Sequence, residues 1–140
     1  MEHAKVISLE EFRHERVQAE ARQRLHERID RWLDRVEAGV KGESPTLEQL
    51  AKEVFAMRHE LTGMVTEALV EQRHVNAMER RTIPCPHCGR LLRGRGPHSR
   101  TVETMVGSVF LTRPYFYCVG CQDGFYPLDE TLQLSEHRKQ

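Results

Sequence analysis

The sequence has no long hydrophobic run and few aromatic residues. No stretch of its 140 residues approaches the roughly 18 consecutive apolar residues that indicate a transmembrane helix. The opening segment, Met1 to Val6, lacks the apolar stretch of a secretory signal, so we expect a cytoplasmic protein with no membrane partner. Aromatic residues make up 6% of the chain and charged residues 30%. This composition argues against an enzyme with a deep pocket.

Acidic residues are missing between Arg80 and Arg100, a segment that contains six arginines. The chain as a whole has a formal net charge of zero. Residues 1–79 carry 12 Lys+Arg and 16 Asp+Glu, a net charge of −4, whereas residues 80–140 carry 9 and 5, a net charge of +4. This asymmetry predicts two parts with different roles, the basic part facing an anionic partner.

Glycine and proline are also absent from residues 9–38, which we predict to be helical. Ser8, with Glu11 three residues later, forms a capping box at the start of this segment. Gly39 ends it. One face of the helix is apolar, because four large side chains recur at spacings of three and four: Leu25, Ile29, Trp32 and Val36.

A second helix is predicted from a cap at Ser44, with Pro45 at its first position, to about Arg80. Its apolar residues follow a heptad pattern: Leu47, Leu50, Val54, Met57, Leu61, Met64 and Ala68. Such a seam suits either a helical hairpin that buries it internally or a coiled-coil homodimer, and both interpretations stay open. Gly63 inside the seam is a mild cost to the helix.

All four cysteines lie in the basic part, as two C-x-x-C pairs separated by 29 residues: Cys85, Cys88, Cys118 and Cys121. Reduced thiols in two tight pairs indicate a metal site rather than disulfides. Two such turns close a tetrahedral site that leaves no position for substrate, so the ion has a structural role. We favour zinc because the surroundings are basic. A rubredoxin-like iron site is the alternative, since the geometry suits either metal.

The segment between the cysteine pairs predicts a β-hairpin, because residues 101–106 and 109–117 are rich in Val, Thr, Phe and Tyr. Gly107 and Ser108 suit a two-residue turn with glycine first. Pro114 cannot donate a ladder hydrogen bond, so the second strand should be an edge strand or be interrupted there.

These patterns together predict an α+β fold with three parts. Residues 1–82 form a long, coiled-coil-like helical hairpin for oligomerisation, residues 83–128 form a small zinc ribbon around a β-hairpin, and residues 129–140 form a C-terminal tail.

The segment from Gly89 to Arg100 contains arginines and glycines without acids, and we expect a mobile cationic loop. Arginine binds phosphate bidentately, and glycine lets backbone N–H groups approach an anion. An ordinary solvated loop is the plainer interpretation. The predicted nucleic-acid-binding residues are Arg80, Arg81, Arg90, Arg93, Arg95, Arg100 and Arg113.

The motifs of residues 83–134 combine into a family resemblance. C-P-H-C-G at residues 85–89, R-P-Y-F-Y-C-V-G-C at 113–121 and P-L-D at 127–129 resemble the N-terminal region of bacterial insertion-sequence transposases of the ISKra group. The resemblance implies a DNA-recognition and assembly region preceded by long helices. The RNase-H-like catalytic domain of such enzymes has no counterpart here, and we interpret Asp129 and Glu130 as solvated acids.

The sequence therefore predicts a non-catalytic zinc-ribbon protein that binds double-stranded DNA and forms a homodimer through its helices. A transposase catalytic subunit is a further candidate partner. Two alternatives remain: a zinc-stabilised adaptor for protein interactions, and a rubredoxin-like electron carrier. A phosphoryl-transfer enzyme is disfavoured because no cluster of carboxylates is available to hold two catalytic metals.

Overall fold

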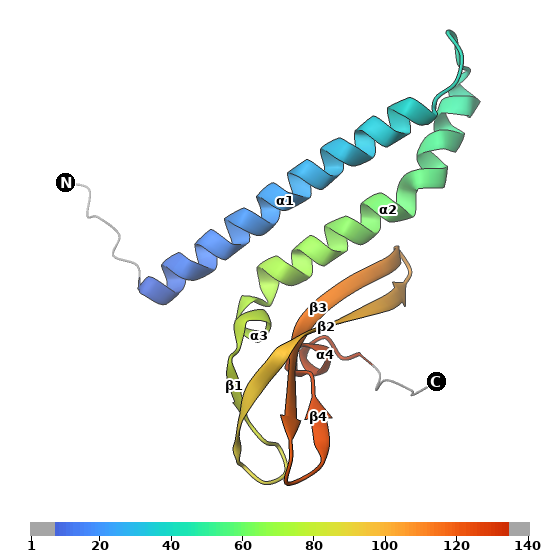
Figure 1. The fold of residues 1–140 in the computed structure, drawn as a ribbon. Helices are drawn as coiled ribbons and strands as arrows, with labels where there is room; N and C mark the ends of the chain where they lie inside the picture. The colour runs from blue at the N-terminus through green and yellow to red at the C-terminus, as the bar shows by residue number, and fades with distance from the viewer. Residues whose placement is uncertain (1–7, 135–140) are drawn as a thin grey trace, which may run out of the picture. The chain divides into compact units, whose positions relative to one another are not determined.

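The computed structural model describes residues 8–134 and confirms an α+β fold, with two long helices followed by a four-stranded antiparallel sheet (Figure 1). The chain divides into two compact units. The helical unit comprises residues 8–73 and 102–109, and the sheet unit comprises residues 74–101 and 110–134. No helix within residues 8–134 combines the length and apolar character needed to cross a membrane.

The first helix, α1 (Leu9–Gly39), begins and ends where the sequence predicts. The Ser8 side chain accepts a hydrogen bond from the backbone N–H of Glu11, and the Glu11 carboxylate accepts one from the Ser8 N–H. This reciprocal pair satisfies two backbone donors that the first helical turn leaves without intrahelical partners.

The second helix, α2 (Leu47–Arg73), begins two residues later than the predicted cap at Ser44 would place it. Thr46 forms the cap instead, because its hydroxyl accepts from the Gln49 N–H and its own N–H donates to the Gln49 side chain. The residue three positions after Ser44 is Leu47, whose side chain cannot accept a hydrogen bond from the Ser44 backbone N–H. The reciprocal capping box therefore favours Thr46.

The predicted apolar face of α1 packs against the seam of α2. Trp32, Val36 and Met64 form the buried centre of the helical unit. Four partly buried side chains surround them: Leu25, Ile29, Met57 and Leu61. The indole Nε1 of Trp32 donates to the Met57 carbonyl at 2.9 Å.

Ion pairs flank this apolar contact along both helices. Arg28 pairs with Glu67 at 2.9 Å, and Arg24 pairs with Glu71 at 2.8 Å, one turn further along both helices. A third pair joins Arg35 to Glu60. The regular progression of these pairs fixes the antiparallel register, although such exposed pairs contribute little stability individually.

The helix predicted to reach Arg80 is broken at His74. Helix α2 ends at Arg73, and a short helix α3 (Val75–Glu79) follows. The side-chain amide of Gln18 donates to the Gln72 carbonyl at 2.8 Å. This bond satisfies one of the carbonyls left free where the helix ends.

Four strands form a sheet in chain order: β1 (Thr82–Pro84), β2 (Leu91–Thr104), β3 (Gly107–Cys118) and β4 (Asp123–Phe125). Pro114 lies in β3 before the segment, beginning at Phe116, that pairs with β4. On the side that faces β4, β3 is therefore still unpaired at Pro114, as an edge position requires. A short helix, α4 (Pro127–Thr131), follows β4.

The hairpin turn lies at Met105 and Val106 rather than at the predicted Gly107 and Ser108. Glu103 and Ser108 face each other across the new turn, with a hydrogen bond of 2.6 Å between their side chains. Gly107 has a φ of +107° and directly follows the turn, a position where a hairpin bulge favours glycine.

The hairpin tip packs on α2 within the helical unit, and two glycines permit the contact. A Cβ added at Gly63 would lie 2.6 Å from the Ser108 carbonyl oxygen, and one at Gly107 would lie 2.8 Å from the His59 Cβ. The Thr62 hydroxyl donates to the Val106 carbonyl at 2.5 Å. Gly63, a cost to the isolated helix, is therefore explained by the close approach of a second segment.

The arginine-rich segment predicted as a mobile loop is instead most of strand β2. Gly96 has a φ of +87°. On one side of it the Ser99 and Thr112 hydroxyls lie 3.1 Å apart, and on the other the Arg95 guanidinium lies over the Tyr117 ring. The register of these two contacts differs by one residue, the offset that a β-bulge introduces.

Candidate metal centre and arginine surface

Two similar turns hold the four cysteines. In the first, the Gly89 N–H donates to the Cys85 carbonyl at 2.9 Å, and the Cys85 N–H donates to the Arg90 carbonyl at 2.8 Å. Gly89 has a φ of +76°. Gln122, which follows the last cysteine of the second turn as Gly89 follows that of the first, also has a positive φ, 51°. Each C-x-x-C pair therefore ends in a left-handed residue that reverses the chain.

The four cysteine sulfur atoms lie within 4.8 Å of one another. The Cys85–Cys121 distance is 3.9 Å, and the Cys88–Cys118 distance is 3.7 Å. A disulfide would bring two sulfurs to about 2 Å, so all four are free thiols. Four thiolates around an ion at about 2.3 Å would be roughly 3.8 Å apart. The cluster thus has the dimensions of a tetrahedral metal site.

The pKa values of Cys85 and Cys121 are shifted in opposite directions. Backbone N–H groups, Cys88 first and then His87, stabilise the Cys85 thiolate against the opposing effect of burial and lower its pKa from 9.0 to about 6. Neighbouring thiols, Cys88 first, together with burial raise the pKa of Cys121 from 9.0 to about 12. Four thiolates so close together need a cation to balance their charge, which is what a metal ion provides.

A small apolar cluster supports the sulfur atoms. Ile83 on β1, Leu92 on β2 and Phe116 on β3 pack with the buried Cys85 and Cys118. The paired positions Ile83 and Leu92 lie on the same face of the sheet. Cys85 and Cys118 are thus buried in the centre of the sheet unit, whereas Cys88 is exposed and Cys121 is half-buried.

His87 lies outside the cluster of sulfur atoms. Its imidazole is exposed, with Nε2 3.4 Å from the Asp123 carboxylate, and its ring lies 5.7 Å from that of Phe125. This arrangement joins the first cysteine turn to β4. The His87 side chain is therefore solvent-exposed and lies beside Asp123 rather than among the sulfur atoms.

Two of the predicted nucleic-acid-binding arginines are not exposed, since Arg113 is buried and Arg100 is half-buried. Arg113 is 1% exposed, and its Nε and a terminal nitrogen donate to both oxygens of Asp129 at 2.7 and 2.8 Å. Its other terminal nitrogen donates to the His98 carbonyl at 3.0 Å. Arg100 also pairs with Asp129, at 3.2 Å. Both arginines therefore have a structural role that holds α4, and the interpretation of Asp129 as a solvated acid is wrong.

The environment of Asp129 stabilises its charged form. Burial alone would raise its pKa, but the hydrogen bonds and charges of Arg113 and Arg100 outweigh burial and lower it below 3.8. The guanidinium of Arg113 also lies 3.8 Å from the centre of the Tyr126 ring. This buried arginine thus faces acceptors and an aromatic ring, as burial of a charge requires.

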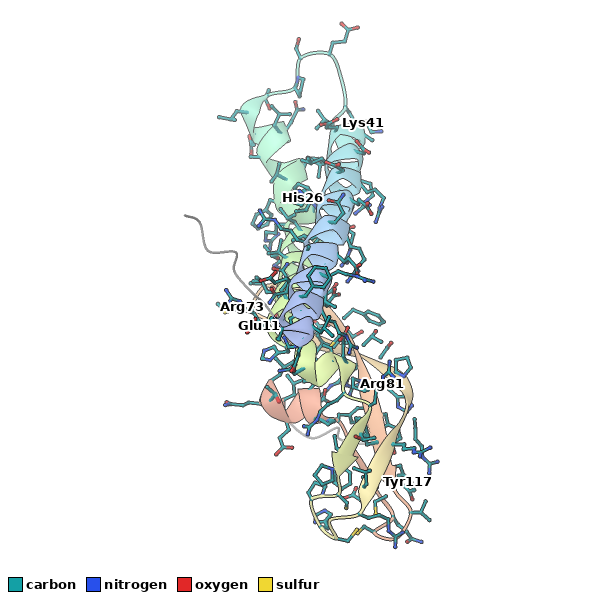
Figure 2. All side chains as sticks on the ribbon, turned by 90° about the vertical axis from the view of Figure 1, so that its left-hand side faces the viewer. Glu11, His26, Lys41, Arg73, Arg81 and Tyr117 are labelled. Atoms are coloured by element: carbon teal, nitrogen blue, oxygen red, sulfur yellow. The ribbon has the colours of Figure 1, made fainter. Side chains whose placement is uncertain are left out.

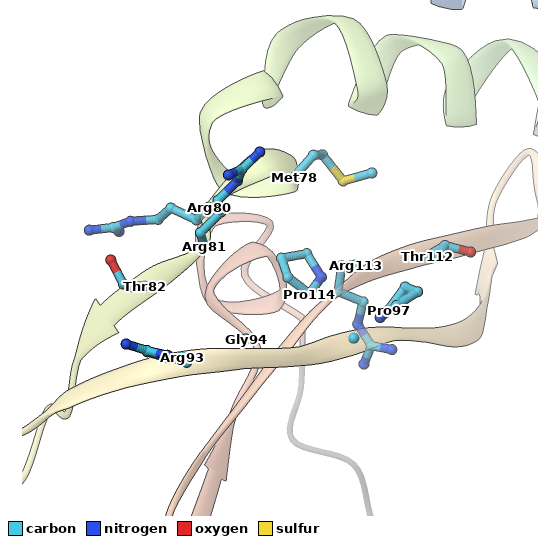
Figure 3. Close-up of a pocket in the computed structure, with 11 residues that line it drawn as sticks. Met78, Arg80, Arg81, Thr82, Arg93, Gly94, Pro97, Thr112, Arg113 and Pro114 are labelled. Carbon is cyan, nitrogen blue, oxygen red and sulfur yellow. The ribbon is translucent and has the colours of Figure 1, made fainter.

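The other five predicted arginines are exposed. Arg80 and Arg81 lead into β1, and Arg93 lies on β2. These three line a groove of about 740 Å³, together with Thr82, Pro97 and Pro114 (Figure 3). Arg93 pairs with Thr82 across the two strands, so the groove runs beside the β1–β2 pair. Its rim is cationic, which suits a chain of phosphates.

A second, smaller hollow of about 300 Å³ adjoins the groove, because Arg93 and Gly94 line both. Arg90, Arg95 and Tyr117 also line it, and the Arg95 guanidinium lies 5.4 Å from the centre of the Tyr117 ring. Figure 2 shows Tyr117 at the end of the sheet unit that carries the sulfur atoms. No local sequence pattern predicts this pairing, which depends on the register of β2 and β3.

Comparisons with protein-family models, with curated proteins and with solved structures found no match.

Proposed function

We propose that the protein is a zinc-ribbon protein that binds double-stranded DNA through the arginine surface of its sheet unit. The main support for this proposal is the set of exposed arginines that line the groove and the hollow: Arg80, Arg81, Arg90, Arg93 and Arg95. Arginine forks suit phosphate oxygens, and such contacts supply most of the non-specific affinity for DNA. The resemblance to the N-terminal region of ISKra-group transposases supports the same proposal, with a transposase catalytic subunit as candidate protein partner.

Zinc is the proposed ion for the cysteine cluster. Four thiolates at tetrahedral spacing suit zinc or iron, and the surrounding arginines favour a structural role over electron transfer. We expect one zinc per chain by elemental analysis of the purified protein. A red protein containing iron instead would favour the rubredoxin-like alternative.

The DNA proposal is tested by titrating the zinc-loaded chain with duplex DNA at several salt concentrations. Replacing Arg93 and Arg95 with alanine should weaken binding and lower the slope of log K against log[salt] by about 2, one for each phosphate that the variant no longer neutralises. The control replaces Arg22 and Arg31, two exposed arginines of α1, and removes the same net charge. Equal effects of both double variants would contradict a specific surface. Wild-type affinity weaker than about 100 μM at physiological salt would refute DNA binding.

Self-association through the helices is the second part of the proposal. The N-terminal end of the α2 seam is exposed at Leu47, Leu50 and Val54, whereas the C-terminal end at Met64 and Ala68 is buried. A second copy of the chain would cover the exposed end. Leu50→Asp with Val54→Asp should give a monomer by sedimentation. Leu69→Asp, at an exposed residue outside the seam, should not. A monomeric wild-type chain at high micromolar concentration would refute the dimer and favour the closed helical hairpin.

A further inference from the structure

The small hollow beside the groove combines apolar and cationic side chains. Leu91 is 67% exposed and Val119 is 65% exposed, although both are apolar. They line the hollow together with Tyr117 and with three arginines: Arg90, Arg93 and Arg95. A surface that binds only phosphates through charge does not require exposed aliphatic and aromatic side chains. This hollow therefore suits a ligand that is both flat and anionic.

The size and lining of the hollow indicate one nucleobase. Its volume of about 300 Å³ is at the lower limit for small-molecule sites. A tyrosine ring offers a base a stacking surface, and aliphatic side chains exclude water from its edge. Inside a duplex both faces of a base are covered by its neighbours, so a base that enters the hollow must be unpaired.

We propose that this hollow binds a single unpaired nucleobase next to a phosphate in the groove, so that the protein prefers DNA with a single-stranded overhang to blunt duplex. The proposal rests on the proposed DNA-binding function. Arg93 links the phosphate-binding groove to the base-binding hollow, because it lines both. A nucleotide whose phosphate contacts Arg93 can therefore place its own base or its neighbour against Tyr117.

The test compares the binding of the full, zinc-loaded chain to a blunt duplex and to the same duplex with a short single-stranded overhang. Wild-type protein should bind the overhang DNA more tightly. Tyr117→Leu should reduce this preference by about 5-fold to 150-fold, the equivalent of one stacked base, and leave the salt slope unchanged. Tyr117→Phe retains the ring and should retain the preference. Zinc content and circular dichroism verify that each variant is folded.

A fluorescent base analogue reports the stacking directly. A 2-aminopurine in the overhang should be quenched by wild-type protein and by Tyr117→Phe, but less by Tyr117→Leu. The same analogue within the duplex serves as the control. Equal affinity of wild-type protein for blunt and overhang DNA would overturn this inference and leave the proposed function intact. Failure to bind either DNA would refute the proposed function itself.

Discussion

Trp32, Val36 and Met64 form the buried centre of the helical unit, whereas the centre of the sheet unit is built around the sulfur atoms of Cys85 and Cys118. The helices bury this apolar cluster against each other, a driving force that needs no ligand. The buried cluster around the cysteines of the sheet unit is small, and two of its five members are themselves cysteines. A small unit of this kind relies on a metal ion or another staple for stability. The two units therefore differ in what their folding requires.

Metal removal should give the largest effect and separates the two units most clearly. A chelator, or Cys118→Ser, should unfold the sheet unit, because metal binding contributes on the order of 10 kcal/mol in small zinc domains. The α1–α2 packing should remain. Nuclear magnetic resonance checks this, since signals from the sheet unit should collapse while those of the Trp32 indole persist.

Addition of zinc after chelation is the control, and it should restore wild-type protein but not Cys118→Ser. Loss of the Trp32 signal together with the sheet signals would contradict the comparison. It would mean that the hairpin tip, residues 102–109, makes the helices depend on the metal.

The buried ion pair of the sheet unit should give the next largest effect. Asp129→Asn leaves Arg113, which is buried, without its counter-charge, and breaking a buried pair in this way costs about 3–5 kcal/mol. Denaturant unfolding of the zinc-saturated protein measures the loss. Glu130→Gln, which neutralises the exposed neighbour, is the matched control and should change the free energy of unfolding little. Equal effects of the two variants would contradict a role for the buried pair.

Acid should remove the stabilisation that the ion pair between Asp129 and Arg113 provides. The pKa of Asp129 is lower in the folded chain than its ordinary value of 3.8. Its stabilisation is therefore present above pH 4 and is lost as the pH falls through the folded-state pKa. The difference in free energy of unfolding between wild type and Asp129→Asn should narrow below about pH 4. Comparing both proteins at each pH cancels the effects that they share. If the difference in free energy of unfolding between the two proteins stays constant below about pH 4, charged Asp129 does not stabilise the fold.

The hairpin tip contributes to the helical unit, and Gly63→Ala measures how tightly it packs. Alanine is the better helix former by about 1 kcal/mol. Its Cβ would nevertheless lie 2.6 Å from the Ser108 carbonyl, and such overpacking costs about 1–3 kcal/mol. We expect a net loss of stability by thermal unfolding. Ala56→Gly, at an exposed residue of the same helix, measures propensity alone. A gain of stability in Gly63→Ala would show that the tip does not hold its place on α2.

The features predictable from the sequence are those set by local pattern. Helical periodicity places Leu25, Ile29, Trp32 and Val36 on one face, and the C-x-x-C spacing brings the four cysteines together. Both depend on residues a few positions apart, or on two turns of known geometry.

Other features depend on contacts distant in the sequence. Arg113 and Arg93 are both arginines of the basic part of the chain, and the sequence does not distinguish them. Arg113 is nevertheless buried against Asp129, whereas Arg93 is exposed. Only the position of α4 distinguishes them. The segment from Gly89 to Arg100 has the composition of a loop, but pairing with β1 and β3 makes most of it a strand. In the same way, contact between α2 and the hairpin tip explains Gly63.

The smallest expected effect lies within the sheet unit, in a comparison of its two cysteine turns. Gly89 and Gln122 hold equivalent positions with φ values of +76° and +51°. A left-handed conformation costs a residue with a side chain about 1–2 kcal/mol, and glycine much less. Gln122→Gly should therefore raise the free energy of unfolding of the zinc-loaded protein by up to about 1 kcal/mol, the gain being partly offset by the entropy of the unfolded chain. Gly89→Gln should lower it by a similar amount, because a Cβ there meets no atom within 4 Å and only the backbone term remains. Opposite signs for the two exchanges in denaturant titrations would establish that both turns use the same left-handed closure. A loss of stability in Gln122→Gly would instead mean that the glutamine side chain stabilises the second turn.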